Sequence, residues 1–162
     1  MMKKLAYALQ MEIDGEQYYR TQARRNKGNA MQRAFLLLAG AEQKHATILR
    51  HMLTLSDVSE IGNMPPDEPE NLFADKEDYR RDAAVLPGQL EVYEIALDME
   101  QKSISFYQEM LDGTKDETTM NMLMFLIREE KKHYAFFEEL TALLRNPRDW
   151  VESAEFGTRE EY

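Results

Sequence analysis

Glu42-Gln43-Lys44-His45 and Glu130-Lys131-Lys132-His133 are the two stretches of sequence that decide the fold. Each places a carboxylate and an imidazole three residues apart, so that both side chains lie on one face of a helix. In each case that face is otherwise apolar. The two stretches are 88 residues apart, since 130 minus 42 and 133 minus 45 both give 88.

The same offset relates other parts of the chain. It aligns Ala8-Leu9-Gln10-Met11-Glu12 with Ala96-Leu97-Asp98-Met99-Glu100, and it aligns Tyr19 with Tyr107. Several matches at a single offset indicate an internal repeat. The sequence therefore predicts a duplicated two-helix hairpin.

Apolar residues recur every three or four positions through both copies, which predicts long helices. The first hairpin spans about residues 3–56 and the second about 88–145, and together they form one all-α four-helix bundle over residues 1–145. Residues 57–87 contain several prolines and acidic residues, which indicates a long crossover. A short helix around 75–84 would fit within it. Residues 146–162 form a C-terminal tail, expected to pack on the bundle or on a partner subunit.

Capping signals mark the start of the second helix in each hairpin. Asn29 with Gln32, and Thr114 with Glu117, have the spacing of a capping box. In an antiparallel hairpin, two residues lie level when their midpoint falls in the turn, because both helices rise about 1.5 Å per residue away from it. The midpoint of residues 12 and 42 is 27, and that of residues 100 and 130 is 115, so each hairpin brings two carboxylates level.

Pairing the two hairpins face to face would gather six polar side chains in the core: Glu12, Glu42, His45, Glu100, Glu130 and His133. Four buried carboxylates need compensating charge, because an unpaired buried ion costs several kcal/mol. Two divalent cations would supply four positive charges against four negative ones. The alternative is a pair of polar layers neutralised by Lys or Arg, but the inward faces offer neither. This pattern is that of ferritin-like di-iron or di-manganese proteins.

The sequence gives weaker evidence that other polar residues near these faces belong to the site. Tyr19 and Tyr107 lie seven residues after Glu12 and Glu100, and they could assist as catalytic residues by hydrogen-bonding a ligand or by lending a proton or an electron. Core aromatics with a hydrated hydroxyl are the other interpretation. Glu16 could be a supplementary carboxylate, although the offset pairs it with an isoleucine.

Composition excludes several classes of function. The chain of 162 residues has no cysteine, so metals must be held by nitrogen and oxygen, and a reducing cytoplasm is the expected location. A net charge of −10 argues against nucleic acid as a partner. No stretch approaches a membrane span, so no membrane association is expected.

The motifs Ala-Leu-x-Met-Glu-x6-Tyr and Glu-x-Lys-His, each present twice, resemble the rubrerythrin-like branch of the ferritin-like superfamily. The resemblance covers about residues 3–145. It implies a centre of two iron ions, with manganese as the alternative, held by the six residues named above, with Glu42 and Glu130 as bridges. It also implies reaction with hydrogen peroxide or dioxygen as an oxidoreductase, a role in oxidative stress, and a homodimer.

Two departures from that family matter. Rubrerythrin proper carries a further iron held by four cysteines, so here an external electron donor is expected. An extra glutamate ligand expected one turn from Glu100 is missing, because Leu97 and Ser103 occupy those positions. Two other functions remain open: iron binding or storage without a dedicated substrate, and a helical interaction module whose polar layer sets register.

Overall fold

The computed structural model describes residues 1–54 and 76–146. Within them the chain forms five helices and no strand: α1 Met2–Arg25, α2 Ala30–Thr54, α4 Lys76–Asp82, α5 Gln89–Asp112 and α6 Glu117–Arg145. The predicted all-α class is confirmed, and α4 lies inside the range suggested for a short helix. The predicted tail and most of the crossover fall outside the described residues.

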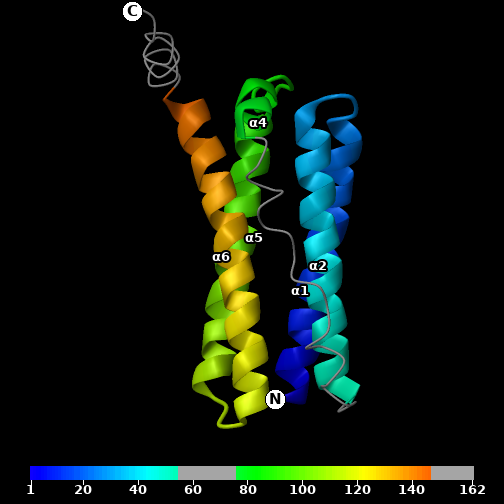
Figure 1. The fold of residues 1–162 in the computed structure, drawn as a ribbon, viewed down its shortest axis with the longest axis vertical. Helices are drawn as coiled ribbons and strands as arrows, with labels where there is room; N and C mark the ends of the chain where they lie inside the picture. Colours follow the sequence, from blue (N-terminus) through cyan, green and yellow to red (C-terminus); the bar gives the residue numbers. More distant parts are fainter. Residues whose placement is uncertain (55–75, 147–162) are drawn as a thin grey trace, which may run out of the picture.

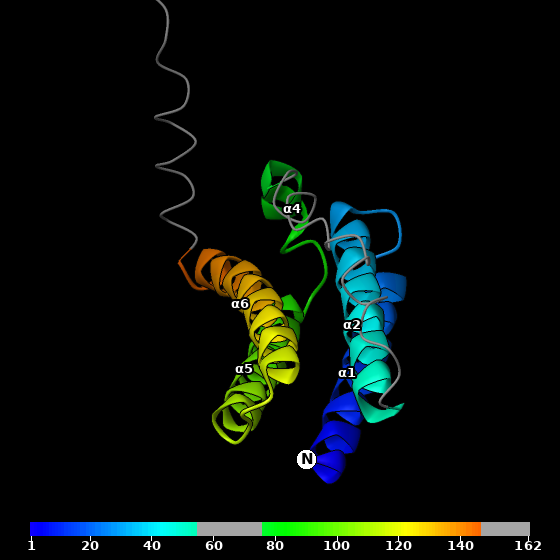
Figure 2. The same ribbon diagram turned by 60° about the horizontal axis from the view of Figure 1, so that its bottom comes forward.

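The four long helices form two antiparallel hairpins that stand side by side (Figure 1). One hairpin pairs α1 with α2, and the other pairs α5 with α6. The hairpins meet along two seams, where α1 contacts α5 and α2 contacts α6. Figure 2 shows α1 and α5 on one face of the bundle and α2 and α6 on the other. This is a ferritin-like helical bundle made within a single chain.

Local signals set the first hairpin turn. Gly28 adopts a φ of +89°, which a residue with a side chain rarely does. Asn29 Oδ1 accepts a hydrogen bond from the Gln32 backbone amide at 3.3 Å, as its capping position predicts. Asp82, at the end of α4, accepts from the Ala30 amide at 2.7 Å. The crossover helix is thereby fastened to the start of α2.

The second hairpin turn differs from the prediction. Asp116, and not Thr114, is the N-cap of α6, because its carboxylate accepts from both the backbone amide and the hydroxyl of Thr119. A carboxylate three residues before a helical amide is a stronger acceptor than a hydroxyl placed five residues before it. The helix therefore begins two residues later than the Thr114 signal indicates.

Two apolar clusters fill the bundle. One contains Phe35, Tyr93 and Phe137, and the other contains Leu49 and Leu126. A layer of buried polar side chains lies between them along the helices. The apolar clusters therefore seal that layer from both ends.

Apolar periodicity predicts Leu9 and Leu97 on the inward faces of α1 and α5, but both faces are turned slightly from that prediction. Ala8 and Ala96 are completely buried, whereas Leu9 and Leu97 are only partly buried. The smaller residues lie one turn before Glu12 and Glu100 on the same face. Alanine at these positions lets the helices approach closely beside the polar layer.

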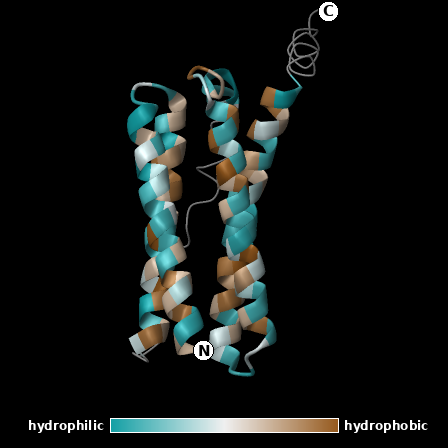
Figure 3. Ribbon diagram, turned by 180° about the vertical axis from the view of Figure 1, so that it is seen from behind, coloured by the Kyte–Doolittle hydropathy of each residue, from teal (hydrophilic) through white to brown (hydrophobic). Residues whose placement is uncertain are grey.

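Hydrophilic and hydrophobic residues are interspersed along the long helices (Figure 3). None of the helices that the structure describes is long and apolar enough to cross a membrane.

Candidate metal centre

Each of the four long helices contributes to one buried polar layer. Helix α1 supplies Glu12 and α5 supplies Glu100, while α2 and α6 supply the two Glu-x-x-His pairs. The exposed fraction of these six side chains is at most 5%. The structure thus brings together all six residues singled out in the sequence.

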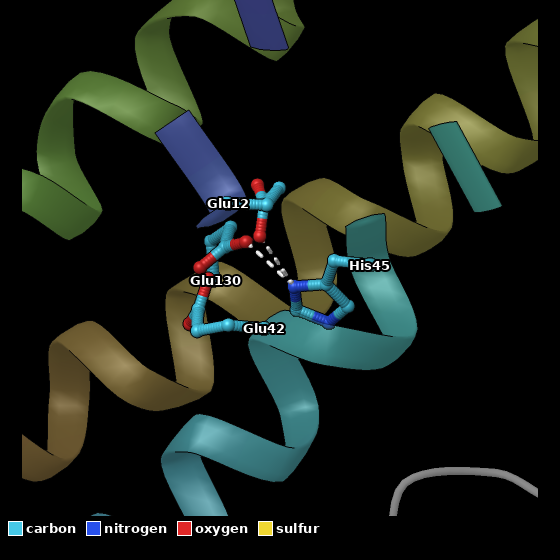
Figure 4. Close-up of side chains that lie close together, drawn as sticks. All are labelled: Glu12, Glu42, His45 and Glu130. Carbon is cyan, nitrogen blue, oxygen red and sulfur yellow. Dashed lines mark ion pairs between the residues drawn. The ribbon is translucent and has the colours of Figure 1, made fainter. Parts of the chain in front are cut away.

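The six residues form two sets of four that share two members. One set is Glu12, Glu42, His45 and Glu130, and the other is Glu42, Glu100, Glu130 and His133. In each set the potential ligand atoms all lie within 4.8 Å of one another. Figure 4 shows the first set converging from three helices. Because Glu42 and Glu130 belong to both sets, the geometry suits two adjacent cations with two carboxylates between them.

The two imidazoles face the carboxylates through Nδ1. His45 Nδ1 lies 2.9 Å from Glu130 Oε1 and 3.3 Å from Glu12 Oε2, the contacts dashed in Figure 4. His133 Nδ1 lies 3.2 Å from Glu42 Oε1, 3.3 Å from Glu130 Oε2 and 3.6 Å from Glu100 Oε1. Each imidazole therefore approaches carboxylates of both hairpins.

Several buried atoms of the layer receive no hydrogen bond of normal geometry. They are Glu12 Oε2, Glu42 Oε1, both carboxylate oxygens of Glu130, and His133 Nδ1. Buried polar atoms are otherwise almost always paired. Ligands of a shared ion are expected to show this arrangement, in which polar atoms converge without aligned hydrogen bonds. The donor set of carboxylate oxygens and imidazole nitrogens also suits iron or manganese.

Without metal, the layer holds protons in place of cations. Burial, followed by repulsion from Glu130, raises the pKa of Glu42 well above its usual range. Burial and the same neighbour raise the pKa of Glu100 to about 8. Both carboxyls are therefore protonated near neutral pH in the metal-free protein.

The pKa values of Glu130 and His133 shift so that each group favours its charged form. Burial disfavours the charged form of Glu130, but the attraction of His45 and the contacts with His133 and Glu100 together outweigh it and hold the pKa of Glu130 well below its usual range. Burial likewise disfavours the charged form of His133, but Glu100 and the other carboxylates raise its pKa well above the usual value. A carboxylate and an imidazolium thus partly neutralise the layer until a metal replaces the protons.

The two tyrosines reach across the seam between α1 and α5. The Tyr19 hydroxyl donates a hydrogen bond to Glu100, and the Tyr107 hydroxyl donates to Glu12. Burial, and then the nearby Glu100, raise the pKa of Tyr19 well above its usual value. Burial, and then Glu12, do the same for Tyr107. Both phenols keep their protons, so they act as donors to carboxylates of the opposite hairpin.

Gly15 is a site residue that sequence reasoning missed. A Cβ atom at this position would lie 3.2 Å from Glu42 Oε2. A glycine inside a long helix costs roughly 1 kcal/mol relative to alanine, so its presence was a signal that a neighbour needs the space. Ser103 is its counterpart under the 88-residue offset.

Glu16 does not join the layer. Its carboxylate instead accepts a hydrogen bond from Arg20 Nε at 2.8 Å, one turn along α1. Glu129 is also buried, beside Glu130, and pairs with Lys132 Nζ at 2.7 Å. Both carboxylates therefore have cationic partners of their own.

The pKa shifts predict how the stability of the metal-free protein depends on pH. The fold holds the Glu100 proton more tightly than the unfolded chain does, so this proton stabilises the fold. That stabilisation is lost as the pH rises from the usual value of 4.5 through about 8. Glu42 and His133 act with the same sign. We expect the thermal unfolding midpoint, measured with a chelator present, to fall over this range.

Glu100→Gln provides the control for this measurement, because an amide at this position does not titrate. The fall in the midpoint should be smaller in this variant than in the wild-type protein. An unfolding midpoint that rises steadily with pH in the wild-type protein would contradict the protonated layer.

Comparison with known proteins identifies the family but no individual relative. A family model described as rubrerythrin matches residues 3–141 of the chain. No curated protein and no solved structure matches. The matched region contains all six residues of the buried layer, and the cluster fits a di-iron carboxylate protein.

Proposed function

The chain belongs to the rubrerythrin family, and from this premise we propose that it is a di-iron oxidoreductase that reduces hydrogen peroxide or dioxygen. The observation that carries the proposal is the pair of ligand sets sharing Glu42 and Glu130. These shared carboxylates would hold two cations side by side, which one isolated ligand set would not do.

The six buried side chains would hold the metal. Glu12 with His45 would complete one site and Glu100 with His133 the other, with Glu42 and Glu130 between them. Two iron ions bound there supply the two electrons that a peroxide takes up, and manganese is the alternative metal. The balanced change is H2O2 with two electrons and two protons giving two water molecules. A one-electron donor outside the chain restores the electrons.

Tyr19 and Tyr107 act as positioning residues in this proposal. Each hydroxyl fixes a carboxylate that belongs to only one ligand set, Glu100 or Glu12. Hydrogen bonds of this kind orient a ligand and hold it in place for the metal. The homodimer and the use of an external electron donor stay predictions.

Metal content should distinguish shared from unshared ligands. We expect about two ions per chain in the wild-type protein, as the two ligand sets imply. Glu130→Gln should weaken the binding of both ions, whereas His45→Ala should abolish the binding of one. Elemental analysis of protein purified without chelator measures this. Glu129→Gln is the matched control, since Glu129 is a buried neighbour outside both sets; equal losses in the two glutamate variants would contradict the assignment.

The tyrosine hydroxyls can be removed with little loss of packing. The Tyr19 ring stacks on Phe137 at 5.7 Å between centroids, and phenylalanine keeps that contact. We expect Tyr19→Phe to weaken metal binding by about 10- to 100-fold, measured by competition with a chelator. Tyr93→Phe is the control, because the Tyr93 hydroxyl donates to the Ala83 carbonyl. Unchanged affinity in Tyr19→Phe would remove the positioning role.

Peroxide reduction is tested with the iron-loaded, reduced protein under anaerobic conditions. We expect about one molecule of hydrogen peroxide to be consumed per two irons oxidised, and steady consumption once an external reductant is added. The Glu130→Gln variant and free iron serve as controls. Turnover no faster than that of free iron would leave iron binding without a substrate as the function.

A further inference from the structure

A pocket of about 730 Å³ lies between α1 and α5 and reaches the buried layer. Its inner end is formed by the polar side chains of Tyr19, Glu42 and Glu100. Three of its outer residues, Tyr7, Asp14 and Gln101, are exposed on the surface of the bundle. The pocket therefore joins solvent to carboxylates of both hairpins.

Two small residues keep the inner end open. Gly15 lies directly against Glu42, where even a methyl group would come within 3.2 Å of the carboxylate. Ser103, its counterpart on α5, also lines the pocket. Larger side chains at these two positions would separate the outer part of the pocket from the layer.

The outer part of the pocket is mainly apolar. The rings of Tyr7 and Phe106 lie with their centroids 5.0 Å apart, and Met11 and Met99 contribute thioether side chains. Thioethers and aromatic edges make favourable contacts with a bound ring or a branched alkyl group. An apolar body and a polar inner end are the usual features of a site for a small organic molecule.

The volume exceeds what the smallest oxidants need. Hydrogen peroxide and dioxygen occupy little more than the roughly 30 Å³ of a water molecule. Pockets that bind organic ligands range from about 300 to 1,000 Å³, and this pocket falls within that range. A channel serving only dioxygen and hydrogen peroxide would not require this volume.

The charges around the pocket favour a neutral occupant. Protons or cations compensate Glu42 and Glu100 at its inner end, Asp14 contributes a carboxylate to its outer part, and Glu109 there pairs with Lys4 Nζ at 2.6 Å. The one lysine in its lining, Lys102, already pairs with Asp98 at 2.6 Å. An anionic molecule such as a fatty acid would meet repulsion here.

We propose that this pocket binds a neutral organic hydroperoxide with a compact aryl or branched alkyl body. The body lies along Met11, Met99 and Phe106, and the O–O group reaches the inner end beside Glu42 and Glu100. The inference rests on the proposed peroxide reaction and names its substrate class. The O–O bond breaks, and ROOH with two electrons and two protons gives ROH and water. The electrons come from the same external one-electron donor.

Binding is tested separately from turnover. The probe is 2-phenyl-2-propanol, the alcohol product of cumene hydroperoxide, titrated into the metal-loaded protein and followed by calorimetry. We expect saturable binding that Ser103→Leu weakens about tenfold or more, as filling a pocket does. Gln108→Leu is the matched control, because Gln108 is exposed on the same helix and does not line the pocket. Met11→Phe, which narrows the pocket from α1, replaces Ser103→Leu if that variant does not fold.

A kinetic measurement on the same samples completes the test. The ratio of kcat/KM for cumene hydroperoxide to that for hydrogen peroxide should fall about tenfold in Ser103→Leu and stay unchanged in Gln108→Leu. Absence of saturable alcohol binding to the wild-type protein, or equal weakening in both variants, overturns the pocket assignment. Alcohol binding without reduction of either peroxide instead overturns the proposed reaction and leaves the binding site standing.

Discussion

Four carboxylates buried at one level are the constraint on which the rest of the structure depends. Glu12, Glu42, Glu100 and Glu130 are each at most 4% exposed. Like charges at this spacing repel strongly in a medium of low dielectric constant. Such a layer persists only with cations or with protons, so the fold and its charge compensation cannot be separated. Protons compensate the carboxylates in the metal-free state, and cations would compensate them in the metal-loaded state.

The surrounding elements maintain that layer. Aromatic and aliphatic clusters close it at both ends along the helices, and the low dielectric constant of this core strengthens the electrostatic contacts inside. Helix α4 contacts α2, and a buried hydrogen bond that Gln89 donates to Asn26 at 3.1 Å ties the start of α5 to the first hairpin turn. The two hairpins are thus held in register by polar contacts as well as by packing.

Much of this arrangement could be predicted from sequence, because periodicity and an internal offset report directly on helix faces. The level placement of Glu12 with Glu42 followed from the turn-centred midpoint, and the structure brings the six residues together. Contacts between helices could not be predicted in the same way. The space beside Gly15 depends on the rotamer of Glu42 across the hairpin, and the burial of Ala8 in place of Leu9 depends on a small rotation of α1. The N-cap at Asp116 was missed because Thr114, two residues earlier, has the spacing of a capping box with Glu117.

The crossed tyrosine contacts give the layer a pseudo-twofold symmetry. Each hairpin carries a glutamate, a tyrosine and a Glu-x-x-His pair, and each tyrosine donates to the glutamate of the other hairpin. Two identical hairpins related by a twofold axis would have to place the same residue on both sides of the centre. The two halves of one chain can differ there, and they do so at Gly15 and Ser103, which both line the pocket. The two sides of the centre therefore need not be chemically equivalent.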